Sequence, residues 1–118
     1  MFRENSSARE QLEELEAVLG FDYDDQDWGI VNADASRTSE FVLFFEQNYN
    51  EHWSPGTVGE FVDLVLESAS NAVRADPDYP VGCIDRFVTM AAPLAPQSIE
   101  YWTSRDWPVT PHLRALGY

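Results

Sequence analysis

The chain has 118 residues, enough for one domain, and a formal net charge of −14, because 21 acidic side chains face seven arginines and no lysine. A surface this negative repels nucleic acid and anionic lipid and attracts basic proteins. Hydrophobic residues make up 44% of the chain and can form a core, which argues against disorder. We therefore expect one folded domain over residues 1–118 with a positively charged protein partner.

The sequence also predicts the compartment. Cys83 is the only cysteine, so no intrachain disulfide can form, and a reducing environment fits best. The first residues lack the apolar core of a signal peptide, and no stretch approaches the ~20 apolar residues that a membrane span needs. We expect a cytoplasmic protein that does not bind a membrane.

The first predicted helix begins after Ser7 and ends at Gly20. Ser7 is followed three residues later by Glu10, which has the form of a capping box, and Gly20 supplies a stop after a run of apolar residues on one face. The other face of this helix is acidic and carries Glu10, Glu13, Glu14 and Glu16.

Helical spacing breaks between Phe21 and Asp34, where we predict an ordered acidic loop. Its carboxylates are Asp22, Asp24, Asp25 and Asp27. An EF-hand calcium loop does not fit this run, because Asp27 stands at the sixth position, where glycine is needed, and Ala33 stands at the twelfth, where glutamate belongs. We therefore expect no metal here.

The remaining segments predict further helices. Asp34 or Ser36 can cap a second helix with an aromatic face, and Ser54 followed by Pro55 starts the third and longest, which ends at residues 76–77. A fourth helix is expected over residues 81–91, a fifth from Pro96, and a final short turn from residue 110. No strand alternation exceeds four residues. The predicted fold is mainly α, a compact bundle of four to six helices.

We expect neither catalysis nor a cofactor. His52 and His112 lie far apart in the sequence, and neither is paired with a second ligand at helical spacing. No glycine-rich phosphate loop occurs, and no nucleophile stands beside a base in a recognisable pattern. Among the four tryptophans, Trp28 follows four aspartates within six residues, so we predict that it is an exposed apolar anchor beside acceptors for arginine or lysine.

Several short segments resemble small bacterial immunity proteins that neutralise polymorphic or contact-dependent growth-inhibition toxins. They are residues 27–37 (DWGIVNADASR), Glu40-Phe41, residues 64–68 (LVLES), Tyr101-Trp102 and residues 108–111 (PVTP). The resemblance implies a compact helical domain that inhibits a cognate toxin stoichiometrically. It does not identify the target, because this group of proteins does not share one toxin type.

The charge and the resemblance lead to one hypothesis, an inhibitor that covers a basic toxin surface. The alternative is an acidic adaptor, or a nucleic-acid mimic without a toxin partner, in which carboxylates would follow an extended ridge. A small helical enzyme would instead show a deep pocket with converging polar groups. The predicted partner-binding residues are Asp22, Asp24, Asp25, Asp27 and Trp28 at the centre, with Glu10, Glu13 and Glu14 as a steering rim.

Overall fold

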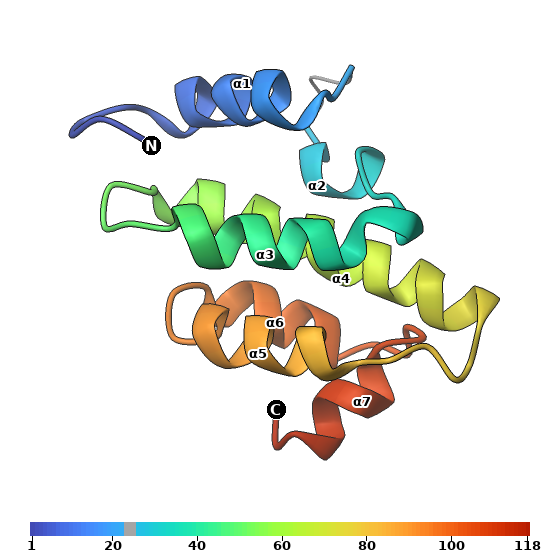
Figure 1. The fold of residues 1–118 in the computed structure, drawn as a ribbon. Coiled ribbons are helices and arrows are strands. Elements are labelled where there is room, and N and C mark those ends of the chain that lie inside the picture. Colours follow the sequence, from blue (N-terminus) through green and yellow to red (C-terminus); the bar gives the residue numbers. More distant parts are fainter. Residues whose placement is uncertain (23–25) are drawn as a thin grey trace.

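The computed structural model describes residues 1–22 and 26–118, and every regular element in this part of the chain is helical. The prediction of a mainly α fold is confirmed. Asp24 and Asp25, two of the predicted binding residues, lie outside the described residues. The elements are α1 (Ala8–Leu19), α2 (Trp28–Val31), a 3-10 helix (Ala35–Arg37), α3 (Thr38–Asn48), α4 (Pro55–Ala75), α5 (Gly82–Ala91), α6 (Pro96–Thr103) and α7 (Thr110–Ala115), as Figure 1 shows.

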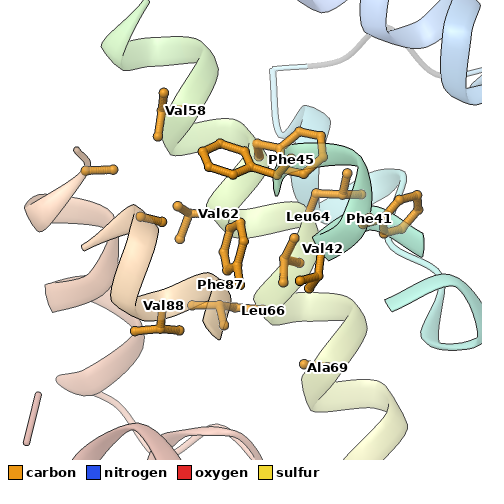
Figure 2. Packing of buried hydrophobic residues seen from close by; sticks show 14 of the residues in the cluster. Phe41, Val42, Phe45, Val58, Val62, Leu64, Leu66, Ala69, Phe87 and Val88 are labelled. Atoms are coloured by element: carbon orange, nitrogen blue, oxygen red, sulfur yellow. The ribbon is translucent and has the colours of Figure 1, made fainter. Parts of the chain in front are cut away.

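The longest helix, α4, is the centre of the fold and contacts α1, α2, α3, α5 and α6 (Figure 1). Most of its residues are buried, so it presents apolar side chains in several directions, as expected for a helix surrounded by others. Figure 2 shows Phe45 of α3, Val62 of α4 and Phe87 of α5 within the shared core. Elements on opposite sides of the molecule are therefore held together through α4.

The predicted starts of α1 and α4 are confirmed by their caps. The Ser7 hydroxyl accepts a hydrogen bond from the Glu10 N–H, the Glu10 side chain accepts one from the Ser7 N–H, and Gly20 ends the helix with φ 75°. The Ser54 hydroxyl accepts a hydrogen bond from the Thr57 N–H at 3.1 Å. Both helices therefore begin where the local sequence satisfies their free N–H groups.

A buried amide joins α1 to the start of α4. The Gln11 side chain is 0% exposed; its Nε2 donates to the His52 carbonyl at 2.7 Å, and its Oε1 accepts from the Ser54 N–H at 2.9 Å. Because a buried amide without partners would be costly, these bonds fix α1 against the loop that precedes α4.

The described residues contain more helical segments than the predicted four to six, and the main difference is α2. This four-residue helix lies inside the segment expected to be a loop. The next boundary also differs: Asp34 caps the 3-10 helix by accepting from the Ser36 N–H, and α3 begins only at Thr38. None of the described helices combines the length and the apolar character that crossing a membrane requires.

Candidate functional site

Trp28 is not the exposed anchor that the sequence predicts. Its side chain is 1% exposed, its ring lies 5.4 Å from that of Phe21, and its Nε1–H donates to Glu16 Oε1 at 3.1 Å. The indole buries more apolar area against these neighbours than it could in a solvated loop, and its only polar atom still has an acceptor. The structure therefore corrects this expectation: Trp28 holds α2 in place and is not available to a partner.

Gly29 brings α2 into direct contact with the backbone of α4. A Cβ at this position would lie 2.3 Å from the Glu60 carbonyl oxygen and 2.8 Å from the Leu64 nitrogen, so only glycine fits without a shift. The Gly29 N–H donates to Glu60 Oε1 at 3.2 Å. This close approach fixes the position of α2 and, with it, of the nearby residues Asp27 and Ile30.

A recess of about 330 Å³ lies where α2, α4 and α6 meet, and we call it the acidic recess. Asp63 of α4 lies in its wall, and Asp27 and Ile30 lie on the α2 side. The lining consists of both polar and apolar groups. Its residues are Asp27, Ile30, Asp63, Gln97, Ser98 and Tyr101.

The carboxylates of Asp63 and Glu60 are half-buried. Burial is the main cause that raises the pKa of Asp63; a hydrogen bond from Trp102 Nε1–H at 2.9 Å lowers it, and the charges of Asp27 and Glu67 raise it further. Burial likewise raises the pKa of Glu60, against the hydrogen bond from Gly29, and the charges of Asp63 and Asp27 add to the effect. Both groups therefore lack the full stabilisation that water would give their charge.

The arginines of this chain do not supply that stabilisation. Among residues 1–22 and 26–118, no arginine forms an ion pair with Glu60 or Asp63. The arginine ion pairs found there are Arg9–Glu13, Arg37–Glu40, Arg86–Glu46 and Arg114–Asp106. The negative charges of Glu60 and Asp63 are thus not neutralised by an ion pair with an arginine of this chain.

Apolar and aromatic side chains accompany the carboxylates. Ile30 is 36% exposed and Tyr101 is 40% exposed, and both line the recess. The guanidinium carbon of Arg105 lies 5.0 Å from the centroid of the Tyr101 ring. The Tyr101 ring therefore already serves as a cation–π acceptor for an arginine of the same chain.

Only one of the predicted partner-binding residues that the structure describes lines this recess. Asp27 lies at the recess, whereas Asp22 and the α1 residues Glu10, Glu13 and Glu14 are exposed elsewhere and do not line it. Glu10 also completes the α1 cap, and Glu13 pairs with Arg9.

Glu60 and Asp63 were not singled out from the sequence. The signal that could have found them is the row Glu60, Asp63 and Glu67, which places three acids on one face of the longest helix at spacings of three and four residues. Like charges at these spacings destabilise an isolated helix, so contacts outside the helix must offset the repulsion between these acids.

Other titratable groups form structural contacts. His112 Nε2 and Asp85 Oδ1 are hydrogen-bonded and join α7 to α5. Within the described ranges, no group of three or more histidine, cysteine, aspartate or glutamate side chains could hold a metal ion.

Comparison with known proteins gave no match to a family model, to a curated protein or to a solved structure. The resemblance to immunity proteins therefore rests on the short sequence segments alone.

Proposed function

We propose that this chain is a non-catalytic immunity protein that acts in the cytoplasm and neutralises a cognate bacterial toxin by covering a basic surface of the toxin. The observation that carries the proposal is the acidic recess, with Asp63 in its wall and Glu60 one turn away on α4; both carboxylates have raised pKa values, and neither forms an ion pair with an arginine within the described part of the chain. A cationic group that entered the recess would favour the ionised form of Asp63 and so offset the effect of burial and of the neighbouring negative charges.

The overall charge supports a protein partner that is basic. A net charge of −14 speeds the approach of a cationic protein and slows that of an anionic one. The exposed acids of α1, Glu13 and Glu14, contribute to this long-range attraction, while half-buried groups such as Asp63 form the close contacts. Exposed charges mainly set the association rate, and half-buried charges mainly set the dissociation rate.

The arrangement favours an inhibitor over a nucleic-acid mimic. Asp27 and Asp63 are 36 residues apart in the sequence and meet at one concave place beside exposed Ile30 and Tyr101. A mimic of a phosphate backbone would instead need carboxylates along a convex ridge. Apolar side chains beside desolvated charge are typical of the anchor region of a protein interface.

Growth rescue tests this proposal. The toxic C-terminal domain of a secreted protein encoded next to this gene is expressed from an inducible promoter, with or without this chain. We expect growth arrest by the domain alone and restored growth with the wild-type chain, and weaker rescue with the double variant Glu60→Gln, Asp63→Asn. The matched control, Glu13→Gln with Glu14→Gln, removes the same charge from α1 and should rescue nearly as well as the wild type.

Three results would contradict the proposal. They are a genome in which no such toxin gene adjoins this one, an adjacent domain that stays toxic when this chain is present, and equal rescue by all variants. A basic partner that is not toxic would favour the alternative of an acidic adaptor.

A further inference from the structure

We propose that the acidic recess receives a single arginine side chain presented by the partner. This inference rests on the proposed function, because it names the chemical group that would occupy the same site.

The size of the recess suits one side chain. Its volume of about 330 Å³ lies at the lower end of the roughly 300–1,000 Å³ that is typical of small-molecule pockets. It is also open to the surface and lined by only a few residues. A long side chain reaching in from a neighbouring protein surface fits these dimensions better than an enclosed cofactor does.

The lining matches the two parts of an arginine side chain. The methylene stem would pack on Ile30 and Tyr101, the exposed apolar groups of the recess, and the guanidinium would face Asp63 and Asp27. Asp63 has one carboxylate oxygen bonded to Trp102 Nε1, which holds this side chain in position without neutralising it. The polar atoms of Gln97 and Ser98 can accept the remaining N–H groups.

An independent contact points to arginine and not only to positive charge. The Arg105 guanidinium carbon already lies over the Tyr101 ring, 5.0 Å from its centroid, so this ring accepts a guanidinium in a cation–π contact. A guanidinium is planar, is weakly hydrated and offers several N–H donors in a fixed fork, whereas an ammonium is compact and strongly hydrated. A half-buried site that combines an aromatic ring with carboxylates therefore favours arginine over lysine.

Titration of the isotope-labelled full chain tests the inference without any toxin. The probes are the N-acetyl methylamides of arginine, lysine and norleucine, added at constant ionic strength and followed by amide and indole N–H chemical shifts. We expect saturable shifts at the Gly29 amide and the Trp102 indole with the arginine probe. Its dissociation constant should be on the order of millimolar and at least threefold lower than that of the lysine probe.

Two variants make the result specific. Asp63→Asn should abolish saturation, and because asparagine can still accept from Trp102 Nε1–H, the unperturbed spectrum elsewhere would show that the fold is kept. Glu14→Gln removes the same charge from an exposed position on α1 and should leave binding unchanged. Trp102 reports on the recess itself, since its indole donates to Asp63, and Gly29 lies between Asp27 and Ile30, which line the recess.

Several outcomes would overturn the inference. They are shifts that grow linearly and equally over the whole acidic surface, an equal response to arginine and lysine, saturation by norleucine, and unchanged binding by Asp63→Asn. The result is separable from growth rescue. Rescue without arginine binding would leave the proposed function standing and remove this inference, whereas arginine binding without rescue would assign the recess to a basic partner other than a toxin.

Discussion

Replacing Gly29 by alanine tests how α2 is held and, with it, how the acidic recess is built. The new Cβ would lie 2.3 Å from the Glu60 carbonyl oxygen and 2.8 Å from the Leu64 nitrogen. Both atoms belong to the backbone of α4 and cannot rotate away. Since ordinary contact begins near 3.4 Å, α2 must move by about 1 Å to accept the methyl group.

Two opposing effects set the magnitude. Alanine is favoured over glycine within a helix by roughly 0.5–1 kcal/mol, whereas overpacking a close contact costs typically 1–3 kcal/mol. We expect the clash to dominate, because the shift also disturbs Trp28, whose indole is 1% exposed and bonded to Glu16. The predicted net loss in the free energy of unfolding is about 2 kcal/mol.

Urea denaturation at pH 7, followed by circular dichroism and tryptophan fluorescence, measures this loss. The control is Gly82→Ala at the start of α5, where a Cβ would meet no atom within 4 Å. That variant should be as stable as the wild type or more stable by up to about 1 kcal/mol. If Gly29→Ala unfolded at the same urea concentration as Gly82→Ala, the close contact between α2 and α4 would be refuted.

Burial raises the pKa of Asp63 in the folded state, so the folded protein binds this proton more tightly and loses stability as pH rises from the ordinary carboxyl pKa through the raised one. Asp63→Asn should therefore raise the free energy of unfolding at pH 7 and make it depend less on pH, as urea titrations between pH 4 and 7 would measure. An unchanged pH profile would count against a desolvated carboxylate. Ser54→Ala removes the cap of α4 and should cost about 1 kcal/mol in the same assay, with no loss if water replaces the hydroxyl fully. Association with a basic partner, measured by stopped flow, should slow steeply between low and physiological salt, where the Debye length is about 8 Å, and a salt-independent rate would exclude electrostatic steering.

The parts of the fold that the sequence predicted are those specified by neighbouring residues. Ser7 with Glu10, and Ser54 with Pro55, satisfy the first N–H groups of their helices within three residues, so α1 and α4 begin as expected. Apolar spacing then predicts which face is buried. These signals are local and depend little on the rest of the chain.

The short helix α2 and the recess depend on contacts between distant residues. Trp28 bonds to Glu16, twelve residues away, and Gly29 bonds to Glu60, 31 residues away. Nothing in the run of aspartates before Trp28 indicates that its ring turns inward. The sequence indicated the acidic run that contains Asp27 but could not indicate that Asp63 of α4 lies in the same recess.

The most direct test of the central claim compares two charge-matched variants in binding to the cognate toxin domain. Glu60→Gln with Asp63→Asn, and Glu13→Gln with Glu14→Gln, lose the same charge, so long-range attraction falls by a similar amount in both. We predict that the dissociation rate rises at least tenfold for the first variant and less than threefold for the second, as measured by surface plasmon resonance. Equal dissociation rates for the two variants would contradict the claim that a cation is held at the acidic recess.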